Sequence, residues 1–145
     1  MSLVLLFTVT ACFDDDEAAI FTDFLVEFDA TSRILPTGSP AVVAVTNGAG
    51  TVGSQVNLVG PQLADAETIT FRVVPDLTTA SDGVNFDLQG GTLTLGAGES
   101  IFSLELNILN DASLTGPVDV GIELVGNGTV AVNPNFSTII FRIAP

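Results

Sequence analysis

The side chains of this 145-residue chain that can do chemistry are almost all carboxylates. The chain has 17 acidic residues and three arginines, with no lysine and no histidine, which gives a net charge of −14 at pH 7. An acidic excess of this size can keep a protein soluble, including in a salty medium where ions screen the repulsion between the charges. The sharper alternative is that some of the carboxylates bind cations.

The residue types on which most enzymes depend are missing. Histidine is the usual general base and a common metal ligand near neutral pH, and the chain contains none. A Ser/His/Asp or Cys/His nucleophilic set therefore cannot form, and no glycine-rich loop carries the lysine that would hold a phosphate. A carboxylate pair for glycoside hydrolysis would need a cleft, which a small β-sandwich does not imply. We expect a protein that is not an enzyme.

The composition also bears on the classes of partner. Nucleic-acid affinity rests on lysine and arginine side chains that displace counterions from phosphates, so this chain is expected to bind no nucleic acid. Anionic lipid surfaces should repel it for the same reason. Glycan-binding platforms mostly use flat Trp and Tyr rings. The chain has neither, and most of its ten Phe residues fall at positions expected to face inward, so glycan binding is disfavoured.

The single cysteine follows a short apolar stretch. Residues 1–11 are too few to span a bilayer, which takes about 20 residues, but they fit the apolar part of a secretory signal. The run Val9-Thr10-Ala11-Cys12 resembles a bacterial lipobox, in which the cysteine is acylated and becomes the mature N-terminus. We therefore expect residues 1–11 to be the remnant of a signal peptide and Cys12 to carry lipid. No lysine or arginine precedes the apolar run, and the alternative is a buried thiol on a first strand.

Four carboxylates follow the cysteine almost at once, namely Asp14, Asp15, Asp16 and Glu17. Like charges in a row stay solvated and extended, so residues 12–20 are expected to form an acidic tether. An acidic run just behind a lipidated cysteine resembles the signal that sends Bacteroidota lipoproteins to the outer face of the outer membrane. The predicted location is therefore the outer membrane with exposure at the cell surface, and the periplasmic face is the alternative.

From residue 21 to residue 145 the pattern is that of short strands. Apolar and polar residues alternate with a period of two, turn formers such as Asn47-Gly48 and Gly60-Pro61 separate the runs, and no stretch keeps a helical period. The expected strands lie near residues 24–28, 52–58, 69–73, 93–95, 102–108, 118–124 and 139–143. This pattern predicts an all-β fold, a single antiparallel immunoglobulin-like β-sandwich of about seven strands. Residues 41–45 are expected to add a short edge strand.

Three stretches of the chain resemble a known family. Residues 79–88 read Thr-Ala-Ser-Asp-Gly-Val-Asn-Phe-Asp-Leu, residues 91–98 read Gly-Thr-Leu-Thr-Leu-Gly-Ala-Gly, and residues 108–111 read Ile-Leu-Asn-Asp. Calx-beta domains, and related β-sandwich domains of Bacteroidota lipoproteins, carry T-A-x-x-G-x-D-aromatic, then G-x-L-x-aliphatic-x-x-G, then I-x-D-D. The resemblance covers about residues 52–143. It implies a β-sandwich over residues 21–145 in which Gly83 makes a turn and Phe86 closes one end of the core.

The resemblance further implies a calcium site at one end of the sandwich. Exchanger-type Calx-beta domains bind Ca²⁺ there with clustered carboxylates, and Ca²⁺ takes six to eight oxygen ligands. Strand alternation brings loops 74–91 and 110–117 to the same end, where the carboxylates of Asp76, Asp82, Asp87 and Asp111 could approach one another. The chain departs from the family at Asn85 and Asn110, where the family has aspartate. The alternative is that the four aspartates cap their own turns and the protein has no cofactor.

Together these inferences predict a lipid-anchored structural or adhesive module at the cell surface or in the periplasm. It would contact the membrane through its lipid anchor. It would bind a protein partner or associate with itself through an exposed edge strand. One alternative is a glycan- or substrate-binding accessory lipoprotein of a polymer-uptake system. Another is a spacer domain stabilised by Ca²⁺.

Overall fold

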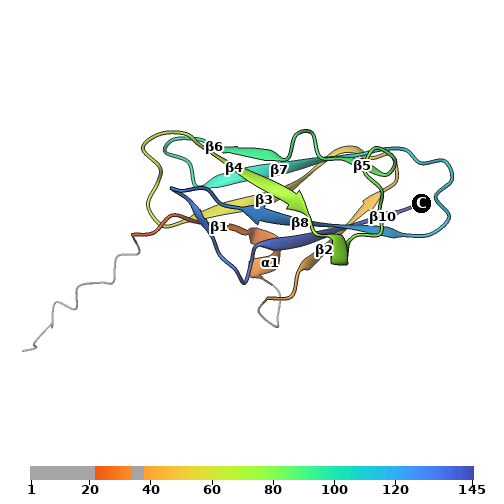
Figure 1. Ribbon diagram of the computed structural model, residues 1–145, viewed down its shortest axis with the longest axis horizontal. Helices are drawn as coiled ribbons and strands as arrows, with labels where there is room; N and C mark the ends of the chain where they lie inside the picture. Colours follow the sequence, from red (N-terminus) through yellow and green to blue (C-terminus); the bar gives the residue numbers. More distant parts are fainter. Residues whose placement is uncertain (1–21, 34–37) are drawn as a thin grey trace, which may run out of the picture.

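The computed structural model describes residues 22–33 and 38–145, which form two five-stranded sheets packed face to face (Figure 1). The first sheet has the order β5-β7-β3-β1-β9, and the second has the order β2-β10-β8-β4-β6. The strands are β1 (Leu25–Phe28), β2 (Ala41–Thr46), β3 (Gly50–Val59), β4 (Glu67–Val73), β5 (Phe86–Asp87), β6 (Thr92–Leu95), β7 (Ile101–Ile108), β8 (Val118–Val125), β9 (Ala131–Val132) and β10 (Thr138–Ala144). A four-residue helix α1 (Asp29–Ser32) and a single 3₁₀ turn η1 (Pro75–Leu77) complete the described elements.

The predicted all-β sandwich is confirmed, with ten strands in the described residues instead of about seven. Two of the additional strands, β5 and β9, have two residues each and are too short to show an alternating pattern. Most neighbouring strands are antiparallel, as predicted. The exceptions are β1 with β9 and β10 with β2, which pair in parallel. The second parallel pair arises because α1 follows β1 and the chain then enters the other sheet as β2.

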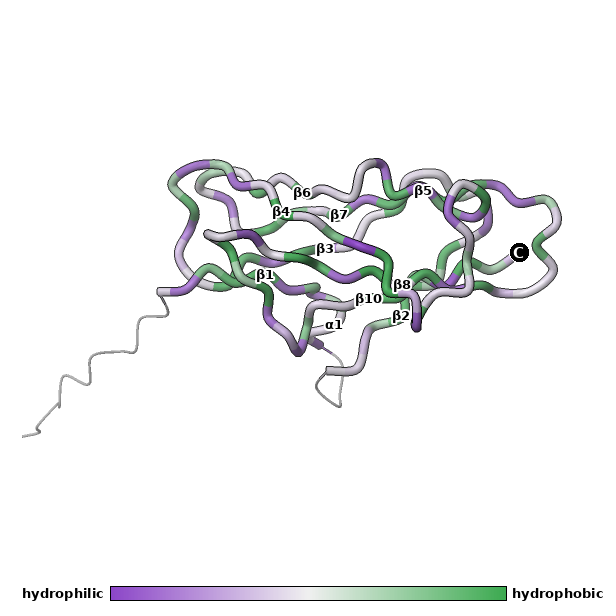
Figure 2. Tube along the Cα trace, in the orientation of Figure 1, coloured by the Kyte–Doolittle hydropathy of each residue, from purple (hydrophilic) through white to green (hydrophobic). Residues whose placement is uncertain are grey.

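The core lies between the two sheets and is built from the inward residues of each strand. In β7 the side chains of Phe102, Leu104, Leu106 and Ile108 are buried, while the intervening residues are exposed or half-buried. Figure 2 shows this alternation of apolar and polar residues along the strands. The largest fully buried side chains are Phe28, Phe86, Phe141, Ile69, Leu95, Leu104, Leu106, Ile108, Ile122, Ile139, Ile143 and Val26.

β3 is the longest described strand, with ten residues, and its two ends mark the two ends of the sandwich. Where Gly50 of β3 lies opposite Ile108 of β7, the connections 47–49, 74–91 and 109–117 gather. We call this the loop end. Its position confirms that loops 74–91 and 110–117 share one end, as strand alternation predicts.

The described chain enters the fold at the opposite end, which we call the entry end. There Leu25 of β1 lies opposite Val59 of β3, at the far end of β3 from the loops. The last strand, β10, runs in the same direction as β1, toward the loop end, where the Ala144 carbonyl accepts a hydrogen bond from the Asn47 N–H (2.8 Å). The C-terminus lies at that end of the molecule (Figure 1). The first and last described strands therefore reach the surface at opposite ends of the sandwich.

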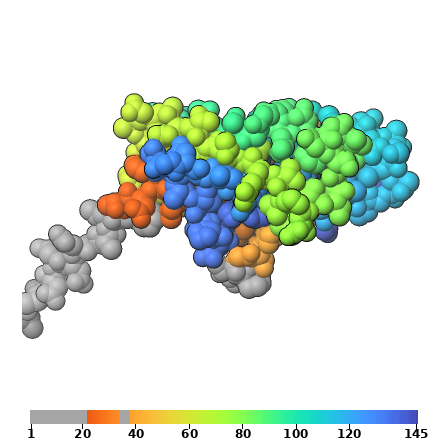
Figure 3. All heavy atoms as spheres, in the orientation of Figure 1, coloured from red at the N-terminus to blue at the C-terminus, as the bar shows by residue number. Residues whose placement is uncertain are grey.

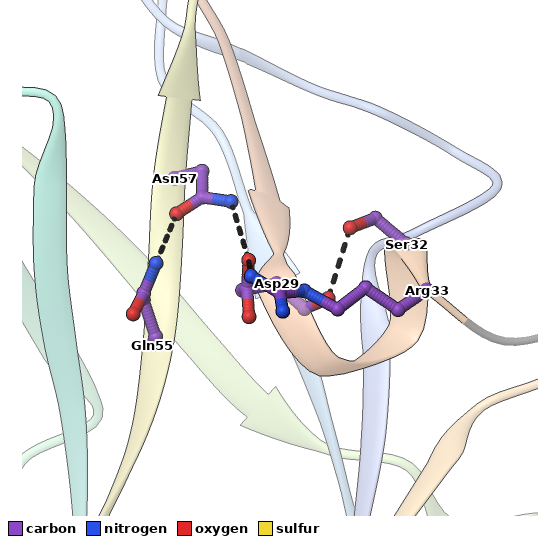
Figure 4. A network of polar contacts seen from close by, with 5 residues as sticks. All are labelled: Asp29, Ser32, Arg33, Gln55 and Asn57. Carbon is purple, nitrogen blue, oxygen red and sulfur yellow. Dashed lines mark hydrogen bonds and ion pairs between the residues drawn. The ribbon is translucent and has the colours of Figure 1, made fainter.

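Helix α1 is fixed at its place by polar side chains. The Thr31 hydroxyl, on a residue that is 1% exposed, donates to the Thr138 carbonyl of β10 (2.7 Å) and accepts from the Ala41 N–H of β2 (3.2 Å). On its outer side, Asp29 Oδ1 accepts from Arg33 Nη2 (2.7 Å) and from Asn57 Nδ2 of β3 (3.1 Å; Figure 4). These bonds connect α1 to both sheets and set where β2 begins.

Segment 74–80 continues the second sheet beyond the end of β4. The Val74 N–H donates to the Gly121 carbonyl of β8 (2.8 Å), and the Gly121 N–H donates to the Thr78 hydroxyl (3.0 Å). Leu77 of η1 lies across β8 so closely that a Cβ at position 121 would be 2.6 Å from the Leu77 Cβ. A side chain at position 121 would displace η1, so glycine is needed there for close packing.

The two isoleucines 139 and 101 offer a matched test of this core. Ile139 of β10 is fully buried, whereas Ile101 of β7 is 65% exposed. We expect Ile139→Ala to lower the free energy of unfolding by about 2–5 kcal/mol, because it removes buried methyl groups and leaves a cavity. Ile101→Ala should change it by about 0.5 kcal/mol or less. Urea denaturation of both variants measures the difference, and equal losses would contradict the packing described here.

Candidate functional site

Asn85 joins the two long loops at the loop end. It is 5% exposed, and every polar group that it has is bonded. Its backbone N–H donates to the Ser81 carbonyl (2.9 Å), and its carbonyl accepts from the Leu109 N–H (2.9 Å). In the side chain, Oδ1 accepts from the Ser81 N–H (2.8 Å), while Nδ2 donates to Asp111 Oδ2 (3.0 Å). A single buried amide thus holds residues 81–86 against the end of β7.

Asp111 is the centre of this arrangement. Its Oδ1 accepts from the Ser113 hydroxyl (2.6 Å) and from the Ser113 N–H (2.9 Å). Its own backbone N–H donates to Asn47 Oδ1 (2.9 Å), and its carbonyl accepts from Asn47 Nδ2 (2.9 Å). We call Asn47, Asn85, Asp111 and Ser113 the loop brace, because together they connect all three loops at this end.

The electrostatics of the loop brace favour an ionised carboxylate. Hydrogen bonds from Ser113 in the first place, and from Asn85, hold the pKa of Asp111 below its ordinary value, although partial burial acts in the other direction. Hydrogen bonds that donate to the charged form of a carboxyl stabilise that form. Asp111 is therefore a hydrogen-bond acceptor at neutral pH and has no proton to donate.

The other three aspartates predicted as calcium ligands do not share the hydrogen bonds of Asp111. Asp76 lies exposed in η1, and Asp82 lies exposed in the loop, where it forms an isolated bridge with Phe86. Asp87 Oδ1 accepts from the Gln89 N–H (2.8 Å), as a turn-capping aspartate does. Among residues 22–33 and 38–145, no three or more acidic, cysteine or histidine side chains are grouped so as to hold a metal ion. Calcium binding stays a prediction, with no preformed cluster in the described residues to support it.

Two members of the loop brace were not singled out by the sequence. The sequence marks Asn47 only as a turn former beside Gly48, and it gives no sign that Ser113 belongs to a site. The partner of Asn47 is 64 positions away in the chain, so no local pattern points to it. Asn85 stands where the resembling family has an aspartate. The Asn85 amide donates directly to the Asp111 carboxylate. An aspartate at position 85 would instead place a second carboxylate beside the first, with no donor between them.

The second candidate site is the free edge of β2, in the sheet opposite β3. β2 is an outer strand, and its only strand neighbour among the described residues is β10. In the space-filling view the orange residues just after position 37 lie at the lower margin of the molecule (Figure 3). Alternate residues of the strand, Val42, Ala44 and Thr46, have exposed side chains, and Val42 is 48% exposed. The sequence predicted a short edge strand here, and the structure confirms it over Ala41–Thr46.

All three arginines of the chain are engaged in ion pairs. Arg33 pairs with Asp29 (2.7 Å), and on the outer face of the second sheet Arg72 pairs with Glu123 (2.7 Å) across neighbouring strands. Arg142 binds both oxygens of Asp119 (2.8 Å each) and lowers the pKa of that carboxyl. Exposed pairs of this kind add little to stability. They do, however, leave most of the acidic side chains in the described part of the chain without a cationic partner.

Cys12 and the acidic run Asp14, Asp15, Asp16 and Glu17 lie outside the described residues. Lipidation and export therefore stay predictions from the sequence. Within the described part of the chain, no helix has both the length and the apolar character needed to cross a bilayer.

No family model matches the sequence, and no curated protein matches it closely enough to be counted as a relative. Solved structures do resemble it. The apo form of the Calx CBD1 domain superposes with a TM-score of 0.61 at 15% identity, over 85% of this chain and 99% of that one. The Calx CBD2 domain gives 0.60 at 14%, over 84% and 87%.

A longer solved structure is similar over part of its length. The structure described as the calcium binding domain CBD12 of CALX1.1 gives a TM-score of 0.56 at 15% identity and covers 80% of this chain. The chain spans less than half of the CBD12 chains that it matches, 44% of this one and 42% of that from CALX1.2. Similarity at this level of identity shows the fold, which is a β-sandwich of the Calx-beta type.

Asn85→Asp tests the loop brace. The substitution replaces the amide donor with a carboxylate beside Asp111 Oδ2, so we expect a loss of about 1–3 kcal/mol in the free energy of unfolding at pH 7. Two adjacent carboxylates raise the pKa of one of them in the folded state. The loss should therefore grow as the pH rises through the ordinary aspartate pKa of about 3.9 and be small below it. Urea denaturation at several pH values measures it.

The matched control for this substitution is Asn135→Asp, which adds the same charge at an exposed turn residue. We expect it to change the free energy of unfolding by about 0.5 kcal/mol or less. Equal effects of the two substitutions at pH 7 would show that net charge, and not the contact with Asp111, is responsible.

Ser113→Ala tests the cause of the lowered Asp111 pKa. The variant loses the hydroxyl donor but keeps the backbone donor, so the pKa of Asp111 should rise toward its ordinary value. Because the folded-state pKa is the lower one, the stability that wild type holds over the variant is complete above the unfolded pKa of about 3.9. It is lost as the pH falls through the folded pKa. NMR titration of the Asp111 carboxyl carbon gives the shift. Ser103→Ala, at an exposed β7 position, should leave it unchanged.

Proposed function

We propose that this chain is a non-catalytic protein-interaction module that is anchored to a membrane by lipid on Cys12 and displayed at the cell surface. The observation that carries the proposal is the arrangement of the two ends. The described chain enters at Leu25, and the loop brace closes the end farthest from that point. A tether attached at the entry end would hold the loop end away from the membrane.

The dimensions agree with such a role. The ten residues of β3 extend for roughly 33 Å at about 3.3 Å per residue. The loop end therefore lies about that far from the entry end, where the tether would join the sandwich. The net charge of −14 supports the same orientation, since an anionic lipid surface repels an acidic domain and keeps it upright on its tether.

The chemistry of the described carboxyls supports a role without catalysis. The three aspartates with shifted pKa values, Asp29, Asp111 and Asp119, all have values lowered by hydrogen-bond donors. A general acid at neutral pH needs a carboxyl whose pKa is raised, as burial in an apolar pocket would do. Hydrogen bonds of the kind seen here make these groups structural acceptors.

The free edge of β2 supports binding of a protein. An outer strand presents unpaired backbone N–H and C=O groups, and extended peptides add to such edges as a further strand. Val42 and Ala44 are exposed beside these groups. The Calx-beta fold is consistent with an interaction module or a Ca²⁺-binding one, and no group of ligands in the described residues favours the second.

Protease treatment of intact cells that carry wild type or Cys12→Ala tests anchoring and display. We expect wild type to be digested while a periplasmic marker survives, and we expect the variant to be released from the membrane fraction. Replacing Asp14, Asp15, Asp16 and Glu17 together with serine should keep the protein in the membrane fraction but protect it from the protease. If Cys12→Ala fractionates like wild type, the lipid anchor is excluded. If wild type is protected, surface display is excluded.

A further inference from the structure

The free edge of β2 is suited to one particular occupant. We propose that it pairs with β2 of a second copy of this chain, antiparallel, about a two-fold axis that passes beside Ala44. This inference rests on the proposed function, because it names the partner of an interaction module. It is argued below from the direction of the free backbone groups, the absence of edge protection, the side-chain pattern and the distribution of charge.

The direction of the backbone groups follows from the register with β10. Asn47 N–H donates to the Ala144 carbonyl, so the odd-numbered residues of this segment turn their backbone groups toward β10. The groups of Val42 and Ala44 and the N–H of Thr46 therefore point away from the sheet. The Thr46 carbonyl already accepts from the Ala49 N–H in the turn (3.0 Å) but has a second lone pair. Five or six backbone groups are thus available at regular spacing.

The β2 edge lacks the structural features that usually prevent an outer strand from pairing with another chain. Natural proteins protect an edge with charged residues, proline, a bulge or a very short strand. The six residues of β2 read Ala-Val-Val-Ala-Val-Thr, and the sequence has no charged residue between Arg33 and Asp65. The other outer strands of the described sheets are shorter, with two residues in β5 and in β9 and four in β6.

The pattern of β2 is complementary to itself when Ala44 lies opposite Ala44 of the second copy. Val42 then lies opposite Thr46, and all of these residues form hydrogen-bonded pairs because their backbone groups point outward. Val43 lies opposite Val45 in the pairs that are not hydrogen-bonded, where side chains approach most closely. Val43 and Val45 are half-buried at the margin of the core. Each would cover the other copy's valine, and pairs of β-branched side chains stabilise neighbouring strands.

The distribution of charge favours a second copy over a charged partner. Two chains that each carry −14 repel one another along most of their surfaces, so they can approach closely only where carboxylates are absent. β2 provides such a stripe. On the adjacent strand Arg142 lies beside Ala44, and its charge is matched by both oxygens of Asp119. An uncharged edge offers nothing to select a basic or an acidic peptide, whereas its own sequence supplies the matching strand.

Antiparallel pairing would also reverse the direction of the second sandwich. The two entry ends would lie at opposite ends of the pair, since β2 runs toward the loop end in each copy. Tethers would leave in opposite directions, which is a geometry suited to joining two facing surfaces.

Disulfide trapping at the symmetry axis tests the register. Hydrogen-bonded partners in an antiparallel pair have Cα atoms about 5.5 Å apart, which is within the range that a disulfide bridges. We expect Ala44→Cys in the full chain, expressed on intact cells that are pelleted into contact and mildly oxidised, to give a covalent dimer of the chain that a reducing agent dissolves. Ala131→Cys, an exposed alanine on the outer strand β9 of the other sheet, is the matched control and should stay monomeric.

Sedimentation velocity of the purified full chain carrying Cys12→Ala gives the second measurement. We expect a monomer–dimer equilibrium that strengthens with added NaCl, because salt screens the repulsion between the two copies. Adding Ala44→Glu should weaken dimerisation about fivefold or more by placing like charges opposite one another, whereas adding Ala131→Glu should have no such effect. The melting temperatures of both Glu variants check that they are folded.

The outcomes separate the two proposals. A chain that stays monomeric at all salt concentrations, and whose Ala44→Cys variant forms no dimer, overturns the self-pairing. If Ala44→Cys instead forms a bond to a different protein, the self-pairing is wrong and the interaction function stands. If dimers form but wild type is protected from protease on intact cells, the self-pairing stands and the proposed surface display fails.

Discussion

The hydrogen bond from Asn85 Nδ2 to Asp111 Oδ2 links the two long loops that close one end of the sandwich. The chain has three arginines for 17 acidic residues, and all three are paired elsewhere, so ion pairs cannot hold these loops together. A neutral amide donor serves instead, because it binds a carboxylate without adding charge. Asn47 completes the connection by bonding both backbone groups of Asp111 from the turn between the two sheets. The order of the loop end thus depends on uncharged hydrogen-bonding groups around one aspartate.

Charged side chains also contribute little to the contacts that hold the rest of the described structure together. Its stability comes from apolar side chains between two sheets, and its polar contacts are mostly amides and hydroxyls that bond backbone groups. Thr31 is an example, since one hydroxyl on a buried residue connects α1 to β10 and to β2. Carboxylates are left to the outer surface, where water and ions solvate them. The uncharged stretch between Arg33 and Asp65 differs from this surface, and it contains β2, the longest outer strand of the two described sheets.

The alternating pattern made most of the fold predictable. Four apolar residues that alternate with polar ones predict a strand at residues 102–108, and the structure has β7 there. Helix α1 was not expected, because four residues leave no helical period in the sequence. β5 and β9 were missed for the same reason. They exist because longer strands beside them offer hydrogen bonds, and such tertiary effects are absent from local patterns.

The candidate site was less predictable than the fold. Strand alternation correctly placed loops 74–91 and 110–117 at one end, but it could not say which side chains meet there. Asp76, Asp82 and Asp87 make no hydrogen bond with the residues around Asp111, whereas Asn85 of the same loop donates to its carboxylate. The direction of a side chain in a loop is set by the hydrogen bonds of its neighbours. These depend on contacts such as that between Asn47 and Asp111, which are far apart in the chain.

The opposite positions of the first and last strands also determine how the domain would carry a mechanical load. Leu25 begins β1 at one end of the sandwich, and Ala144 ends β10 at the other. A force between these points would pull each strand along its own axis against its neighbours, β3 for the first and β8 and β2 for the last. Ladder hydrogen bonds lie across that direction, so many of them would have to break together. A sandwich connected in this way resists stretching, which is a useful property for any domain that stands between a surface and an object that pulls on it.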